Sequence, residues 1–361
     1  MHMADALISP AVGGTLWAAA GLLTVFSAKK LQATLDDCKI PLMGVLGAFV
    51  FAAQMINFTI PGTGSSGHLG GGMLLAILLG PHAAFLTMAS ILTVQALFFA
   101  DGGLLALGCN IINLGFLTTF VAYPLIYRPL AGSQPTRRRI MAGSITAAVL
   151  GLQMGALAVV LETVLSGISE LPFGSFLLMM TPIHLAIGVV EGLVTATVVS
   201  FLWKARPDLV EGLLRSRPAT DAHRISLKAV LAALLLITAL TGGVFSWFAS
   251  AHPDGLEWSM FKTAGKEELE APEGGVYGFL AGIQKRTAVL PDYDFKKSEP
   301  EAGDAAIAEG KEGEQESQSS WPSVNPGTSV AGLVGAVITL IVAGLLGAGL
   351  KRVAATKPVN R

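Results

Sequence analysis

Nine long apolar stretches constrain the fold of this chain more than any other feature of its sequence. A helix needs about 20 predominantly apolar residues to cross the hydrocarbon core of a bilayer, and roughly 17–25 are tolerated. Stretches of this kind lie at residues 7–27, 41–58, 67–83, 84–100, 103–127, 140–165, 178–203, 226–250 and 328–350. The composition, with 52% hydrophobic and 14% charged residues, is also more apolar than that of a soluble domain. We therefore predict an all-α integral membrane protein with nine spans in contact with lipid.

The third stretch is short and Gly-rich, and it runs into Gly80-Pro81, a natural break between helices. The distribution of positive charge decides whether it spans, because Lys and Arg concentrate in cytoplasmic loops. With nine spans and the N-terminus outside, 17 of the 24 Lys and Arg residues fall on the inner side, and the other 7 lie in one long loop. Without the third span, the cluster Arg137–Arg139 would lie outside. We therefore predict nine spans in the cell membrane, with the N-terminus outside and the C-terminus in the cytoplasm.

Composition also divides the chain into two membrane units. The polar residues 206–225 are predicted to form a cytoplasmic linker between a seven-span core at residues 1–205 and a two-span unit at residues 226–350, followed by a cytoplasmic tail at 351–361. The loop at residues 251–327 carries 15 acidic and 7 basic residues and is predicted to lie outside. The last part of this loop is highly charged and poorly hydrophobic, which is typical of a flexible tether.

The first two residues, Met1 and His2, form a potential metal chelate. No Lys or Arg precedes the first span, so the start of the chain does not resemble a cleavable signal peptide, and both residues are expected to remain in the mature protein. A free amine at Met1, the His2 amide nitrogen and the His2 Nδ1 atom would supply three nitrogens in one plane. His68 is the other histidine that the predicted topology places on the same face, at the mouth of the third span.

Four nitrogens in a square plane favour Ni(II) or Cu(II) over Zn(II), which prefers tetrahedral sites, and low-spin Co(II) also fits. The alternative is that His2 is an ordinary polar residue at the lipid interface and that His68 is a loop residue. Spacing alone leaves both interpretations open.

The segment around His68 is rich in glycine. Residues 62–68, GTGSSGH, nearly match a phosphate-binding loop, but His68 replaces the Lys, Leu69 replaces the Ser or Thr, and no soluble nucleotide-binding domain surrounds them. We therefore reject ATP binding and expect the glycines to allow close approach of the backbone to a ligand or to another helix. Cys38 and Cys109 form no CxxC pair and no disulfide framework, so redox chemistry is not expected.

Several polar residues in or near the apolar stretches could support or gate a metal site. His184 and Glu191 lie seven residues apart on one face of the seventh span. A charged residue at mid-membrane costs about 2.5–3.5 kcal/mol on insertion scales, so Glu191 is expected to face the bundle interior and to have a partner. A packing hydrogen bond between helices is the alternative role. Other residues that could orient ligands or gate the site are Asn57, Ser66, Gln95, Asp101, Asn110 and Glu162.

Several motifs, in order along the chain, resemble one family of transporters. They are the opening MHMADALISP, the segment MINFTIPGTGSSGHLGGG with the following ILLGPHAA, the segment FFADGGLLALGCNIINLG, and IHLAIGVVEGL. They make residues 1–205 similar to the substrate-capturing membrane component of nickel and cobalt energy-coupling-factor transporters. The sequence PDGLEW at residues 253–258, flanked by two spans, resembles the small accessory subunit of the same systems, fused here to the same chain. The family often has Pro-Asp-Gly after its first residues, whereas this chain has Ala4-Asp5-Ala6, which leaves the chelating positions unchanged.

The resemblance implies ligands, a function and partners. In that family the metal is held by the N-terminal amine, the amide and imidazole of the second residue, and a histidine before the third span, which implies Met1, His2 and His68 here. The chain is then expected to capture Ni(II) or Co(II) as a transported substrate, with no organic cofactor. Delivery inward would need a transmembrane coupling subunit and cytoplasmic ATPases, so the chain itself would not be an enzyme, and nucleic acid is not expected as a partner.

Two alternatives come from other functional classes. The chain could be an ATP-independent metal transporter or channel, which the absence of a coupling subunit and ATPases in neighbouring reading frames would favour. It could also be an intramembrane enzyme, although the sequence contains no HExxH motif and offers no clear Ser-His-Asp set.

Overall fold

The computed structural model describes residues 2–33, 38–133, 135–210, 225–296 and 321–356, and almost all of their regular structure is helical. The first unit contains η1 (Asp5–Leu7), α1 (Pro10–Gln32), α2 (Lys39–Gln54), β1 (Phe58–Ile60), β2 (Ser65–Gly67), α3 (Gly72–Leu79), α4 (Pro81–Val94), η2 (Gln95–Phe99), α5 (Leu107–Asn110), η3 (Ile111–Tyr127), α6 (Arg128–Ala131), α7 (Arg137–Ser166), α8 (Phe173–Ala205) and η4 (Pro207–Leu209). The second unit contains α9 (Leu227–Gly243), η5 (Phe245–Phe248), α10 (Gly255–Ala264), α11 (Gly275–Thr287), η6 (Pro291–Tyr293) and α13 (Pro326–Thr356).

The predicted fold class, an all-α integral membrane protein, is confirmed. Among the described residues, six helical segments are long and apolar enough to cross a membrane: α1, α4 with η2, α5 through η3 to α6, α7, α8 and α13. Helices α2 and α9 are apolar but shorter. Eight of the nine predicted stretches thus contain an apolar helix of at least three turns.

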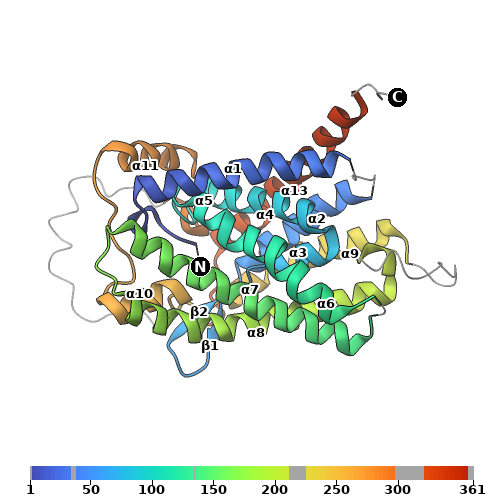
Figure 1. Ribbon diagram of the computed structural model, residues 1–361, viewed down its shortest axis with the longest axis horizontal. Helices are drawn as coiled ribbons and strands as arrows, with labels where there is room; N and C mark the ends of the chain where they lie inside the picture. Colours follow the sequence, from blue (N-terminus) through green and yellow to red (C-terminus); the bar gives the residue numbers. More distant parts are fainter. Residues whose placement is uncertain (1, 34–37, 134, 211–224, 297–320, 357–361) are drawn as a thin grey trace.

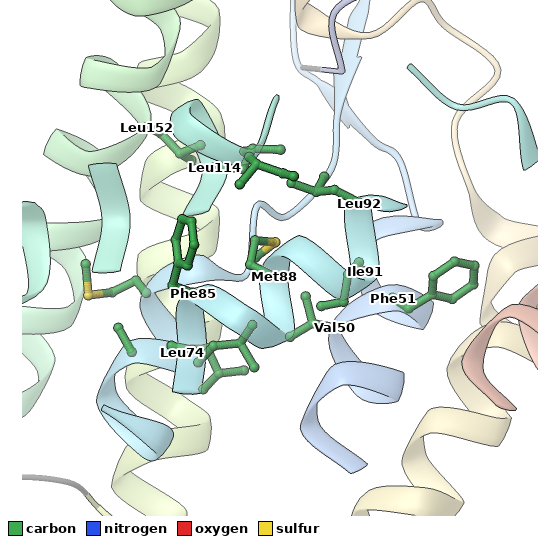
Figure 2. Packing of buried hydrophobic residues seen from close by; sticks show 14 of the residues in the cluster. Val50, Phe51, Leu74, Phe85, Met88, Ile91, Leu92, Leu114 and Leu152 are labelled. Atoms are coloured by element: carbon green, nitrogen blue, oxygen red, sulfur yellow. The ribbon is translucent and has the colours of Figure 1, made fainter. Parts of the chain in front are cut away.

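The core of the bundle is built around α4. Of the span formed by α4 and η2, 78% is buried inside the protein, whereas only 17% of α1 is buried, so α1 lies at the periphery. In Figure 2 the side chains of Phe85 and Met88 on α4 lie between Leu114 of η3 and Leu74 of α3, and all four are buried. Ile91 of the same helix lies toward Val50 of α2. Helix α4 is therefore the helix against which α1, α2, α3 and η3 are packed.

The third predicted span differs from the prediction, because its helix covers only Gly72–Leu79 and ends at the break before α4. Helix α3 has eight residues, about 12 Å at 1.5 Å per residue, and the chain before it, residues 68–71, is not helical. Gly71 has a φ of 76°, and a Cβ there would overlap the Val50 side chain. Irregular backbone at membrane depth requires partners within the protein. Glu191 and Gln54 supply them, as described below.

Several elements of the second unit pack against the first. Helices α9 and α13 lie against α2. The short elements between them lie at the same end of the bundle as the β1–β2 hairpin, on the left of Figure 1, and we call this the hairpin end. The acidic loop predicted at residues 251–327 is therefore folded where the structure describes it, in α10, α11 and η6. Most of the predicted tether, and most of the predicted linker at residues 206–225, lie outside the described residues.

Candidate metal centre

Met3 is buried, and its backbone lies beside the segment that joins η2 to α5. The Met3 amide donates to Asn110 Oδ1 at 2.8 Å, and its carbonyl accepts from Asn110 Nδ2 at 3.2 Å and from the Gly103 amide at 2.9 Å. Asp5 Oδ1 accepts from the Ala106 amide at 3.0 Å. Gly103 has to lack a side chain, because a Cβ there would overlap the Asp5 carboxylate. These contacts fix the backbone immediately after His2.

The structure brings His2 and His68 together at the hairpin end. Their rings stack with centroids 5.1 Å apart and planes inclined by 10°. The side chains are only 7% and 9% exposed. His2 Nδ1 lies 3.1 Å from Asp101 Oδ1, and His68 Nδ1 lies 3.1 Å from the Leu69 carbonyl oxygen. Met1 lies outside the described residues.

Burial keeps the His68 ring neutral, whereas contacts with His2 and Tyr293 keep the neighbouring Asp101 charged. Burial lowers the pKa of His68 to about 3, so its imidazole carries no proton charge near neutral pH. Burial alone would raise the pKa of Asp101, but the His2 ring and the Tyr293 hydroxyl, which donates to Asp101 Oδ2, bring that pKa below its ordinary value. A neutral imidazole beside a carboxylate is a combination that suits a divalent cation.

The second unit covers this site with the start of α10. Asp254 caps the helix, because its Oδ1 accepts from the Leu256 amide at 2.7 Å and from the Glu257 amide at 3.0 Å. Its other oxygen, Oδ2, lies 3.9 Å from His68 Nε2. The Ser66 amide donates to the Pro253 carbonyl at 2.8 Å, and this bond fastens the strand next to His68 to the second unit.

The other predicted site residues take different places. The Ser66 hydroxyl donates to the His252 carbonyl at 2.8 Å, and Asn57 uses its backbone carbonyl to accept from the Ser250 amide at 2.7 Å. Glu191 Oε2 accepts from the Gly70 amide at 2.8 Å, and its Oε1 accepts from the Gly71 amide at 3.2 Å. Glu191 therefore holds the segment that follows His68, and Asn57 and Ser66 join the hairpin to the second unit.

His184 lies beside His68 rather than in contact with His2. A cavity of about 10 Å³ is lined by His68, His184 and Asp254, together with Gly67, Gly70, Leu114, Leu152, Ile187 and Gly255. Among the described residues, no group of three or more His, Cys, Asp or Glu side chains is arranged to hold a metal ion. The predicted ligand set has only two side chains, His2 and His68, and its other donors are the amine of Met1 and the amide of His2.

Sequence reasoning missed Asp254 and Tyr293 as neighbours of the site. The PDGLE sequence that contains Asp254 was recognisable as a motif, but its place next to His68 depends on a contact across 186 residues. Tyr293 has no motif around it that marks it. Asn110 was visible as a polar residue in an apolar stretch, and its pairing with the Met3 backbone could not be read from that pattern.

Comparison with known proteins gives matches over both units. Residues 2–209 match the model of the family described as "Cobalt uptake substrate-specific transmembrane region", and residues 228–352 match the "PDGLE domain". The chain is 32% identical over 360 residues to a protein of Archaeoglobus fulgidus named "Putative fused nickel transport protein NikMN", which covers 99% of this chain and 100% of that protein. It is also 32% identical over 319 residues to the "Fused nickel transport protein NikMN" of Rhodobacter capsulatus, over 81% of this chain and 88% of the relative.

A solved structure titled "Crystal Structure of an Truncated Transition metal Transporter" matches with a TM-score of 0.50 and 31% sequence identity. The match covers 56% of this chain and 99% of that one. The fold of the first unit is therefore that of a known metal transporter.

Proposed function

Because the chain belongs to the family of the cobalt uptake substrate-specific transmembrane region, we propose that it is the substrate-capture subunit of an ATP-driven importer of divalent transition-metal ions. The substrate is Ni(II) or Co(II), taken up at the hairpin end and delivered through the membrane. The coupling subunit and the ATPases would be separate proteins, in keeping with the resemblance described above. Nickel is the favoured ion, because relatives that carry both units are named nickel transport proteins and because the proposed site is planar.

The observation that carries this proposal is the buried pairing of His2 with His68 under the start of α10. We place the ion between four nitrogens: the Met1 amine, the His2 amide, His2 Nδ1 and His68 Nε2. Imidazole nitrogens suit nickel, and a planar set of four nitrogens is a preferred geometry of Ni(II). The fixed backbone at Met3 supports this arrangement, since it holds the chelating segment in one place.

Loading of this site requires one ring to turn. The lone pair of an imidazole nitrogen lies in the plane of the ring, so two stacked rings inclined by 10° cannot both direct a lone pair at one ion. His2 is the ring that has to move, because its Nδ1 lies against Asp101 in the described arrangement. Capture of the ion thus exchanges the contact between His2 and Asp101 for a bond between His2 and the metal.

The test is a nickel titration of two proteins that differ by one alanine placed before Met1. The added residue converts the Met1 amine into an amide and moves the free amine one position away. We expect at least a tenfold loss of nickel affinity and a change in the visible absorption band of the bound ion. Intact mass spectrometry of the unmodified protein checks whether Met1 is its first residue. A tag after Arg361 is the control and should leave the affinity unchanged; equal affinities with and without the added alanine would contradict the chelate.

A further inference from the structure

The cavity below the capture site contains a second histidine that the proposed chelate does not use. His184 is 1% exposed, and it lines the cavity of about 10 Å³ together with His68 and Asp254. A space of this size accommodates about one water-sized particle. It is therefore large enough for a single ion that has shed its water and too small for any organic molecule.

The hydrogen bonds of His184 determine which of its nitrogens is available. Its Nδ1 lies 2.8 Å from the Met180 carbonyl oxygen, and a carbonyl can only accept, so Nδ1 carries the proton. Nε2 then bears the lone pair, and this buried atom has no hydrogen-bond partner among the described residues. The His68 ring also directs its Nδ1 at a carbonyl oxygen, that of Leu69, at 3.1 Å, which places the proton on Nδ1. Two neutral imidazoles thus contribute Nε2 lone pairs to the surroundings of one small cavity.

A purely structural histidine at position 184 carries an energetic cost. Leaving a buried acceptor unsatisfied costs about 1–3 kcal/mol, which an apolar side chain at position 184 would avoid. The backbone of the second unit also approaches this ring closely, since a Cβ at Gly255 would lie 3.2 Å from His184 Cε1 and 2.7 Å from Ile183 Cγ2. Gly255 therefore lets α10 close over the cavity without displacing the imidazole.

We propose that His184 is a transit ligand, which takes the ion from His68 on its way inward. This inference rests on the proposed function, because it requires the ion to arrive at the chelate formed by Met1 and His2. In the step, a bond forms between the metal and His184 Nε2, and the bond between the metal and His68 Nε2 breaks. Both nitrogens are neutral lone-pair donors, so no proton and no electron is transferred. The cavity that His68 and His184 share provides the space for the exchange.

Helix α8 carries His184 and is also connected to the segment that follows His68. Glu191 lies seven residues further along the same helix, about 10 Å at 1.5 Å per residue, and binds the amides of Gly70 and Gly71. A displacement of α8 therefore acts on His184 directly and on His68 through the segment that follows it. One helix is in contact with both sides of the proposed exchange.

The test is a double-mutant cycle on the full chain in lipid nanodiscs, with Ni(II) alone as the probe. The variants are His68→Ala, His184→Gln and the two combined. Glutamine can still donate to the Met180 carbonyl but offers no imidazole nitrogen. His82→Gln is the matched control, since His82 also has a buried ring nitrogen with no partner in the described part of the chain. Its ring packs against Phe26 and Phe120, and it does not line this cavity.

In the otherwise unchanged chain, we expect His184→Gln to alter nickel affinity less than threefold, because His68 fills the fourth position. In the His68→Ala background, we expect His184 to bind the ion in place of His68. Adding His184→Gln should then lower the nickel affinity at least a further tenfold. The visible absorption band of the bound nickel should then shift, because one imidazole nitrogen is missing from its ligands. His82→Gln should have no effect in either background.

Equal small effects of His184→Gln on nickel affinity in both backgrounds would contradict the proposed role of His184. Such a result would not contradict the proposed chelate. Failure of the unmodified chain to bind nickel would instead overturn the proposed function. Should His184→Gln fail to fold, His184→Asn is the second variant, and size-exclusion profiles identify which protein is native. The same tenfold criterion applies to either substitution.

Discussion

At the scale of single residues, Tyr293 contacts the neighbourhood of His2 from a turn with a strained backbone. Asp292 and Tyr293 have left-handed backbone φ values of 51° and 59°. Such positions cost about 1–3 kcal/mol each and persist only where the surroundings determine them. The Tyr293 ring stacks on Phe99 with centroids 5.0 Å apart, and its hydroxyl donates to Asp101. The strained turn therefore serves to bring a donor from the second unit to the carboxylate that faces His2.

This arrangement predicts that Tyr293→Phe destabilises the outer part of the second unit more than Tyr277→Phe does. A hydrogen bond to a charged group contributes about 1.5–3 kcal/mol, whereas one to a neutral group contributes about 0.5–1.5 kcal/mol. Tyr293 donates to a carboxylate, and Tyr277 donates to the Ile8 carbonyl at 2.9 Å. The measurement is hydrogen exchange of the Val289 and Leu290 amides, which donate to the Phe98 carbonyl. Faster exchange in Tyr277→Phe than in Tyr293→Phe would show that the bond to Asp101 does not hold this turn.

At the scale of elements, the apolar stretches predicted the helices well, because the requirement for about 20 apolar residues is local and can be read from sequence. The third stretch failed as a full span for an equally physical reason. Its glycines permit an irregular backbone at residues 68–71, and that backbone is satisfied by long-range partners. Gln54 donates to the Gly70 carbonyl at 2.8 Å, and Glu191 accepts from the two amides. The sequence predicted that Glu191 needs a partner, but a backbone amide has no sequence signature.

The link between α8 and this segment predicts the effect of Glu191→Gln. A carboxylate accepts from both the Gly70 and the Gly71 amides, whereas glutamine offers one oxygen and turns an N–H₂ group toward the other amide. One buried amide is then unsatisfied, at a cost of about 1–3 kcal/mol. We expect a lower thermal midpoint and, because His68 lies two residues before Gly70, at least a threefold lower nickel affinity.

Glu170→Gln is the matched control for this prediction. Glu170 is exposed and lies outside the regular helices, between α7 and α8. Its substitution should change neither the thermal midpoint nor the nickel affinity. If Glu191→Gln behaves like Glu170→Gln in both measurements, the carboxylate does not position His68.

At the scale of the whole molecule, the second unit is part of the site rather than an appendage. Its contacts reach back to the first residues of the chain, as in the bonds from Tyr277 to Ile8 and from Trp258 to the Thr63 carbonyl at 3.0 Å. Such contacts join residues about 200 or more positions apart, and no local pattern specifies them. The two histidines could be predicted to share a face from topology alone. Their enclosure by α10 and η6 could not, because it depends on how two separately recognisable units pack.

The last prediction concerns the orientation of the molecule in the membrane, which can be tested by labelling cysteine residues. Cys38 is exposed and Cys109 is buried, so a thiol reagent has one accessible native target among the described cysteines. Cys38 is next to Lys39 and follows Lys29 and Lys30, and positive charge of this kind marks the cytoplasmic side. The exposed residue Glu267 lies in the acidic loop, shortly after the end of α10.

In intact cells, a membrane-impermeant maleimide should therefore label Glu267→Cys and leave Cys38 unmodified. Permeabilised cells should show labelling at both positions, and a Cys38→Ser background identifies the second signal. Capture from outside requires this result, because an ion can reach His2 and His68 only from the end of the bundle that α10 covers. Labelling of Cys38 but not of residue 267 in intact cells would place the metal site on the cytoplasmic side, and the chain could not then serve as the entry point of an importer.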